Sequence, residues 1–298
     1  MNGILNIRKE KGMTSFDAVA KIRRLLRTKK AGHSGTLDPD AEGVLVVCVG
    51  RATKLVPDME HDTKSYEAVM RLGVTTDTQD MTGTILSERP VTSSTEEVRE
   101  AVLSFQGEQM QIPPMYSALK VDGQKLCDLA RRGVTIERKP RPVTFQSVEV
   151  LEIDLPLVRF RTDCSKGAYI RTMCNDIGEK LGCGGSMESL IRTRAGRFEI
   201  GDAVTLSELG AAVDSKEGIE GQSFFTGIEE YYGDLPRLTP GKAFDPAIRN
   251  GNVIRQKTDL ADGAAARVYT SEGVFAGIYR YRTGEGLRLV RYFYEDHT

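Results

Sequence analysis

The sequence has few of the residues that build metal sites or disulfide frameworks. Its 298 residues include five cysteines, scattered and with no C-x-x-C pair, and three histidines that lie far apart. An odd, scattered set of cysteines argues against a complete disulfide framework. The same spacing argues against a structural zinc site, although ligands can converge from distant segments. We therefore expect no bound metal.

Long apolar runs and a leader pattern are also missing. No run approaches the roughly 20 residues that a bilayer-spanning helix needs, so we expect no membrane partner. Residues 1–7 lack the basic flank, apolar run and small-residue cleavage site of a signal peptide. These absences predict a cytoplasmic protein. At roughly 100–200 residues per domain, the length favours two domains.

The formal net charge of −1 conceals an uneven distribution. Residues 1–30 carry nine basic and two acidic side chains, a balance of +7, and residues 117–145 have a balance of +4. Residues 201–298 have a balance of −4. Either basic block alone is typical of a solvated face. Two blocks that flank the most unusual motif of the chain favour contact with a polyanion.

Hydrophobic periodicity predicts strands and separate helices rather than regular βαβ units, which indicates an α+β fold. Capping boxes predict helices that begin after Thr14 and Ser94, the second ending near Gly107. A further helix is expected over 168–181. The apolar run 44–49 predicts a strand covered on both faces. Other strands are expected near 66–72, 143–153 and 156–164.

Two further regions differ from this pattern. Residues 108–141 contain Pro113-Pro114, a short helical pattern and Lys139-Pro140-Arg141-Pro142, which predicts a basic, partly irregular inserted segment. Residues 235–241 are typical of a linker, and strand patterns follow near 265–270, 274–282 and 287–294. We therefore predict domains over 1–234 and 235–298, the second small and all-β.

The most unusual stretch runs from Gly32 to Leu45, GHSGTLDPDAEGVL. It lacks the GxxxxGK[ST] spacing of a phosphate-binding loop. Asp38-Pro39 by itself is a common turn dipeptide. The residue types alone indicate only a rigid, irregular loop that presents Asp38 beside positive charge.

This stretch resembles the catalytic motif of the TruB family of tRNA pseudouridine synthases, GH[ST]GTLDPxAxGVL. Similar segments follow in the family's order over residues 2–200: KSYEA at 64–68, QIPPMYSALK at 111–120, KGAYIRT at 166–172 and LIRTRAGRF at 190–198. The resemblance implies a catalytic domain with a mixed, largely antiparallel sheet and a basic inserted thumb segment. The terminal β unit is similar to a PUA-like domain.

The resemblance also implies the reaction. Uridine 55 in the TΨC loop of tRNA would become pseudouridine after its N1–C1′ bond breaks, the base rotates and C5 joins C1′. No redox change or group transfer occurs, so no cofactor is expected. The partner would be the T-arm stem-loop, with no obligatory protein partner, and the protein would be a monomer.

By resemblance, Asp38 would be the nucleophile, because an aspartate with an ordinary pKa of about 3.9 is ionised at neutral pH. The sequence leaves open whether it attacks C6 or C1′, or whether the sugar loses a proton instead. Arg171 would pair with Asp38 and orient it. Near a helix start a cation gains nothing from the helix dipole, which favours a specific partner for Arg171 over a solvated one.

The remaining candidates would hold the RNA. Tyr66 would stack on the flipped base, Tyr169 would supply a hydroxyl or act as a general base, and Leu190 would form an apolar wall. Each is equally typical of a packed core residue. His33 would insert into the RNA loop or stabilise the flipped state, and the phosphate backbone would be held by Lys120, Arg131, Arg132 and Lys166.

The sequence departs from the family pattern at Glu42 and Ile191, and together these changes are expected to weaken RNA affinity. Three alternatives stay open: a tRNA chaperone whose catalysis is incidental, the catalytic subunit of a guide-RNA-directed complex, and an RNA-binding protein without activity. The absence of a long basic tail favours the stand-alone bacterial form over the guided one.

Overall fold

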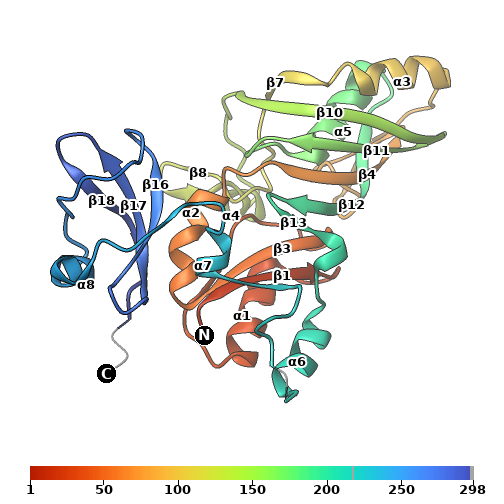
Figure 1. Cartoon of the computed structure of the whole chain (residues 1–298). Coiled ribbons are helices and arrows are strands. Elements are labelled where there is room, and N and C mark those ends of the chain that lie inside the picture. Colours follow the sequence, from red (N-terminus) through yellow and green to blue (C-terminus); the bar gives the residue numbers. More distant parts are fainter. Residues whose placement is uncertain (217, 296–298) are drawn as a thin grey trace.

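The computed structural model describes residues 1–216 and 218–295. One large sheet organises the chain (Figure 1), with strands in the order β14-β1-β3-β12-β4-β11-β10-β7, while β13 pairs with β12 and β2 with β3. Every described strand pair in it is antiparallel except β3–β12. The strands are β1 (Gly3–Lys9), β2 (Ala31–His33), β3 (Glu42–Val49), β4 (Lys64–Leu72), β7 (Gly107–Gln111), β10 (Arg141–Asp154), β11 (Leu157–Cys164), β12 (Gly185–Ala195), β13 (Phe198–Glu199) and β14 (Phe225–Gly227).

Helices cover this sheet in two groups. α1 and α6 pack on β1 and β3, whereas α3 and α5 pack on the half formed by β4, β10 and β11 (Figure 1). The prediction of an α+β chain with a mixed, largely antiparallel sheet is confirmed. The helices are α1 (Ser15–Leu25), α2 (Val56–Met59), α3 (Thr95–Leu103), α4 (Leu126–Arg131), α5 (Ile170–Lys180), α6 (Leu206–Asp214), α7 (Ile228–Tyr231) and α8 (Asp245–Arg249), with 3₁₀ helices at Gly50–Leu55, Ile200–Asp202 and Lys242–Phe244.

Strand β3 is covered on both faces, as its apolar run predicts. Leu45 and Val47 lie in a core cluster with α1 and α6. Val44 and Val46 lie in another cluster that includes residues of the C-terminal sheet. Successive residues of a strand point to opposite faces, so an uninterrupted apolar run is what two covering layers require.

Both predicted capping boxes are present, at Thr14 with Asp17 and at Ser94 with Glu97. The predicted ends are less accurate. α3 ends at Leu103, and Gly107, which we expected at its end, begins strand β7 with a φ of +104°. The helix expected over 168–181 spans 170–180.

The inserted segment is tied to the sheet at both ends. Its first residues belong to β7, which pairs with 141–145 of β10, so residues 112–140 are the part that projects from the sheet. The projecting part contains α4 and a small hairpin of β8 (Lys120–Val121) and β9 (Gln124–Lys125). A separate hairpin, β5 (Val74–Thr76) and β6 (Ile85–Glu88), follows β4.

The three predicted C-terminal strands are present as β16 (Ala265–Tyr269), β17 (Phe275–Arg282) and β18 (Gly286–Tyr292). The expected linker contains a fourth strand, β15 (Arg237–Leu238), parallel to β16. The unit is not all-β, because α8 precedes the three strands. Pro246 in its first turn is pre-organised for a helix start and gave a signal that periodicity missed.

Candidate active site

The loop of residues 34–41, called here the Asp38 loop, joins β2 to β3 and is held by buried cations. The Lys9 Nζ donates hydrogen bonds to the backbone oxygens of Pro39 at 2.9 Å and Ala41 at 2.7 Å. Burial lowers the pKa of Lys9 to about 8. Since Lys9 is fully buried, its inclusion in the basic block of residues 1–30 as a candidate for polyanion contact was wrong.

Arg192 of β12 holds the other side of the loop. Its guanidinium donates to the carbonyls of Gly35 at 3.1 Å, Thr36 at 3.3 Å and Val44 at 2.6 Å. Gly43 makes this close packing possible, because its φ is +102° and an added Cβ would lie 2.2 Å from the Arg192 carbonyl oxygen. The loop therefore has a fixed backbone, as the sequence predicts, although its anchors were not identified from sequence.

Asp38 lies opposite Arg171, the second residue of α5. The Asp38 Oδ1 and the Arg171 Nη2 are 3.1 Å apart, with the arginine side chain 5% exposed and the aspartate 32% exposed. Burial raises the pKa of Asp38 above its ordinary value, and the Arg171 charge opposes that rise. The pair is thus a partly exposed carboxylate beside a buried guanidinium, whose charge favours the ionised form of Asp38 while desolvation disfavours it.

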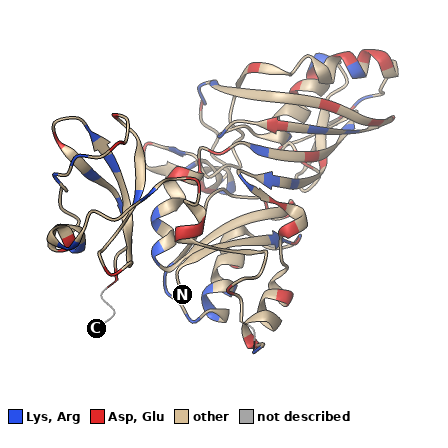
Figure 2. Ribbon diagram, viewed as in Figure 1, with Lys and Arg blue, Asp and Glu red and all other residues tan. Residues whose placement is uncertain are grey.

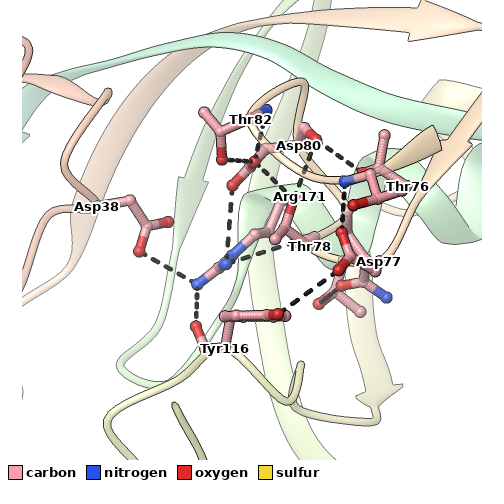
Figure 3. Close-up of polar contacts among 11 residues, drawn as sticks. Asp38, Thr76, Asp77, Thr78, Asp80, Thr82, Tyr116 and Arg171 are labelled. Atoms are coloured by element: carbon pink, nitrogen blue, oxygen red, sulfur yellow. Dashed lines mark hydrogen bonds and ion pairs between the residues drawn. The ribbon is translucent and has the colours of Figure 1, made fainter. Parts of the chain in front are cut away.

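A turn of residues 77–84, the Asp80 turn, holds the far side of this guanidinium (Figure 3). The Arg171 Nη1 lies 3.7 Å from Asp80 Oδ2 and donates to the Thr78 carbonyl at 3.4 Å. Asp80 Oδ1 accepts bonds from the hydroxyls of Thr78 at 2.8 Å and Thr82 at 2.5 Å. Sequence analysis missed Asp80. Its available signal was a run of turn-forming residues after a strand.

A pocket of about 1090 Å³ opens over the Asp38–Arg171 pair. It brings together most of the residues predicted from the sequence. The predicted residues in its lining are Asp38, Tyr66, Tyr169, Arg171, His33, Leu190, Lys120, Arg131 and Lys166. Arg132 is absent from this lining, and its guanidinium donates instead to Gln124 Oε1 at 2.7 Å.

Neighbouring strands form the pocket floor. Tyr66 of β4 is paired with Arg192 of β12. Two residues further along the same strands, Ala68 is paired with Leu190. Both Tyr66 and Leu190 are buried. Burial raises the pKa of Tyr66, so its hydroxyl keeps its proton at neutral pH. An aromatic ring and an aliphatic side chain thus present apolar surface beside Asp38.

Two more predicted residues lie at the pocket wall. Tyr169 directly precedes α5, and the Gln111 side chain accepts from its N–H at 3.0 Å and donates to its carbonyl at 3.2 Å. His33 in β2 has a buried Nδ1 without a hydrogen-bond partner among the described residues. Burial lowers the pKa of His33, which favours the neutral ring at pH 7.

Lys64 adds a positive charge that sequence analysis did not predict as functional. It lies two residues before Tyr66, so both side chains point to the same face of β4. Its Nζ donates to the carbonyls of Glu60 at 2.8 Å and Asp62 at 2.7 Å, and burial lowers its pKa. With Arg192, it gives the pocket two buried cations whose hydrogen bonds go to backbone carbonyls.

One face of the main sheet carries many charged side chains of both signs (Figure 2). On the solvent face of β4, β10 and β11, acidic and basic side chains alternate and form cross-strand ion pairs, such as Arg159 with Glu67 and Arg161 with Glu149. Such a face is locally neutral.

Glu42 and Ile191, the two positions where the sequence departs from the family pattern, are neighbours in the fold. The Glu42 carboxylate lies 3.7 Å from the Lys11 ammonium group, and Glu42 is paired in register with Ile191 of β12.

The described part of the chain, 1–216 and 218–295, holds no group of three or more His, Cys, Asp or Glu side chains placed to bind a metal. Within the same residues, no helix combines the length and apolar character needed to cross a membrane.

Comparison with known proteins agrees with this geometry. The family model described as TruB family pseudouridylate synthase (N terminal domain) matches residues 23–170, and the tRNA pseudouridylate synthase B C-terminal domain matches residues 171–227. The tRNA pseudouridine synthase B of Clostridium kluyveri is 44% identical over 93% of this chain and 95% of its own. That of Lachnoclostridium phytofermentans is 46% identical over 94% and 95%. A chain in the crystal structure of a Cbf5-Nop10-Gar1 complex has a TM-score of 0.71 and 26% identity, covering 98% of this chain and 85% of that one.

Proposed function

This chain belongs to the TruB family of pseudouridine synthases and is a tRNA-modifying isomerase, and we propose that its target is uridine 55 in the TΨC loop of tRNA. Asp38 acts as the nucleophile on a base flipped out of the loop. The observation that carries this proposal is the ion pair of Asp38 with the buried Arg171 at the floor of a large pocket.

The electrostatics of the pair suit a nucleophilic carboxylate. Partial burial raises the pKa of Asp38, which makes its carboxylate more basic than one in water. The Arg171 charge favours the ionised carboxylate, and the guanidinium geometry fixes its orientation. Arg171 donates its hydrogen bond to Oδ1 of Asp38. The other carboxylate oxygen, Oδ2, takes no part in that bond.

The pocket walls suit a flipped pyrimidine. Unstacking a nucleotide costs a few kcal/mol, and stacking a base on an aromatic ring returns about 1–3 kcal/mol. Tyr66 is the ring in reach of Asp38, with Leu190 as the apolar wall beside it. Tyr169 supplies a further hydroxyl to the pocket, beside the base and available as a proton acceptor.

The remaining basic candidates serve the phosphate backbone. Lys120 and Arg131 of the inserted segment line one side of the pocket, and Lys166 lines another. Single-stranded loops are where proteins read RNA bases, and phosphate contacts supply a salt-dependent share of the affinity. We also propose that the PUA-like C-terminal unit, part of a region with a charge balance of −4 over residues 201–298, contacts the tRNA weakly or only at its end, and that the protein acts as a monomer without a protein partner.

The test is tritium release from T-arm RNA labelled at uridine C5, since C5 loses its hydrogen when it joins C1′. We expect release by the wild type and none by Asp38→Asn, with RNA binding retained by both. Asp40→Asn removes an exposed carboxylate from the same loop and is the matched control, expected to stay within a few-fold of wild type. Tight binding by the wild type without release would contradict the proposal.

The same assay separates the guided alternative, which the similarity to the Cbf5 chain brings forward. Release by purified protein with T-arm RNA and no other component excludes a requirement for guide RNA. A chaperone role is separated by the cellular phenotype, which would persist in Asp38→Asn if folding of the tRNA were the main activity.

A further inference from the structure

Arg171 has a shorter contact than its ion pair with Asp38. Its Nη2 donates to the backbone carbonyl of Tyr116 at 2.7 Å, compared with 3.1 Å to Asp38 Oδ1. Tyr116 lies near the start of the projecting part of the inserted segment, in PPMYSALK. One nitrogen of the buried guanidinium is therefore shared between the proposed nucleophile and the root of the inserted segment (Figure 3).

The side chain of Tyr116 holds this carbonyl against the Asp80 turn. Its hydroxyl donates to Asp77 Oδ2 at 3.5 Å, and Asp77 Oδ1 accepts from the Thr84 N–H at 2.7 Å (Figure 3). The turn also contacts Arg171 directly through Thr78 and Asp80. The hydroxyl of Tyr116 thus contacts the turn that holds Arg171, while its backbone carbonyl contacts Arg171 itself.

We infer that Tyr116 is a positioning residue for the Asp38–Arg171 pair, an inference that rests on the function proposed above. The guanidinium is fixed by contacts on three sides: Asp38, the Asp80 turn and the Tyr116 carbonyl. Loss of the third contact leaves Nη2 free to rotate away from Asp38. A charge-assisted pair contributes to catalysis only while its geometry is kept.

Residues 116–119, called here the root of the inserted segment, also hold the helix that ends at Arg131, one of the residues proposed to bind RNA. The Cys127 N–H donates to the Ser117 carbonyl at 3.0 Å, and the Leu126 N–H donates to the Leu119 carbonyl at 2.8 Å. These bonds attach the start of α4, the helix that ends at Arg131, to the residues directly after Tyr116. Seating of the inserted segment on RNA and orientation of Arg171 are therefore linked through one short stretch of backbone.

The experiment compares Tyr116→Phe and Tyr116→Ala with the wild type in single-turnover tritium release at saturating protein, alongside the dissociation constant for T-arm RNA. Tyr116→Phe keeps the ring and loses one hydroxyl whose contact is long and exposed, so we expect a rate lower by about two-fold to a few-fold, the low end for one hydrogen bond. Tyr116→Ala frees the root, and a misplacement of about 1 Å costs up to about 100-fold. Tyr281→Phe, in the C-terminal sheet, is the matched control and is expected to be unchanged.

The pH profile is the readout that a merely structural role would not move. Arg171 opposes the rise in the pKa of Asp38, so a loosened guanidinium lets that pKa rise further and moves the acid limb of the rate to higher pH. A normal rate and an unshifted limb in both Tyr116 variants would overturn the inference. So would weaker RNA binding with an unchanged rate at saturation. If Tyr116→Ala does not fold, Tyr116→Phe decides.

A second measurement keeps this inference separate from the proposed function. Carbon NMR of labelled aspartate, assigned by difference from Asp38→Asn, follows the titration of the Asp38 carboxyl without RNA. A higher pKa of Asp38 in the Tyr116 variants supports the inference even if the wild type releases no tritium, and an identical pKa contradicts it. If the wild type releases tritium and the Tyr116 variants match it in rate and in the pKa of Asp38, the proposed function holds and this inference is refuted.

Discussion

Asp38 is a carboxylate whose surroundings change its pKa in opposite directions. Burial raises the pKa, Arg171 lowers it, and the nearby Asp80 raises it again. A single guanidinium thus stands between two carboxylates, at 3.1 Å from one and 3.7 Å from the other. Of the two cations that lower the pKa of Asp38, Arg171 and Lys9, Arg171 has the larger effect.

Replacement of Arg171 by Met is therefore expected to raise the pKa of Asp38 further, because burial and Asp80 remain. The single-turnover rate at pH 7 should fall by about 10²–10³, the range for loss of one preorganised electrostatic contact. The acid limb of the pH–rate profile should move to higher pH, and Arg171→Lys should restore part of both. Arg161→Met, on the charge-balanced sheet face, is the control. A lower rate with an unmoved limb would show that Arg171 acts in some other way.

Residue-level prediction worked best where a motif carried the residue. The resemblance pointed to Asp38, Tyr66, Tyr169, Arg171 and Leu190, and the fold brings them to one pocket. It did not identify the buried cations Lys9, Lys64 and Arg192. A lysine or arginine in a sequence is normally solvated, and only the folded backbone shows the carbonyls that accept its hydrogen bonds.

At the scale of the elements, the inserted segment presents two adjacent arginines differently. Arg131 lines the pocket and pairs with Asp128 at 3.4 Å, whereas Arg132 lies outside the lining and donates to Gln124 and to the Asp128 carbonyl. Arg131 is the last residue of α4, whereas Arg132 caps the helix outside it, so the two side chains leave the backbone in different directions. The two arginines are not equivalent candidates for phosphate contact.

We predict that Arg131→Gln lowers the slope of log affinity for T-arm RNA against log salt by about 1, as loss of one phosphate contact does. Arg132→Gln should change the slope by less, because its guanidinium lies outside the pocket. Filter binding over a range of salt concentrations measures both, with Arg288→Gln in the C-terminal sheet as the control. Equal slopes for the two segment variants would contradict this ranking.

Element boundaries were predicted less well than element types. Gly107 begins β7 instead of ending α3, and β15 lies within the expected linker. Both errors concern strands of a few residues whose pairing partners are distant in sequence. Such strands have no periodicity of their own, and backbone hydrogen bonds to the neighbouring strand decide them.

At the scale of the whole molecule, the C-terminal sheet packs on the main sheet. Ile278 and Phe293 share a core cluster with Ile4 and Val46, on the face of β3 opposite α1. The Arg291–Asp58 ion pair, at 2.6 Å, lies at the same junction. The two units thus complete one core, and removal of one exposes apolar surface of the other.

Ile278→Ala should therefore destabilise more than the C-terminal sheet alone. Deletion of a buried isoleucine side chain to alanine costs about 2–5 kcal/mol of unfolding free energy. Urea unfolding followed by far-UV circular dichroism measures the loss, and tritium release at 25 °C should be nearly unchanged, since Ile278 lies away from the pocket. Val253→Ala, at a 42% exposed position, is the control. An unchanged midpoint for Ile278→Ala would show that the junction contributes little.

The sequence by itself determined the α+β class, the doubly covered strand β3, two capped helices, the C-terminal strands and, through a dozen-residue motif, the family, and the same motif makes Asp38 the proposed nucleophile. These are local patterns, set by periodicity, turn chemistry and side-chain type. Only the tertiary structure decided that Asp80 and Tyr116 share Arg171 with Asp38, that Lys9 and Arg192 fix the Asp38 loop, and that Arg132 lies outside the pocket. Those facts depend on contacts between segments distant in sequence, and on which charges lose water when the chain folds.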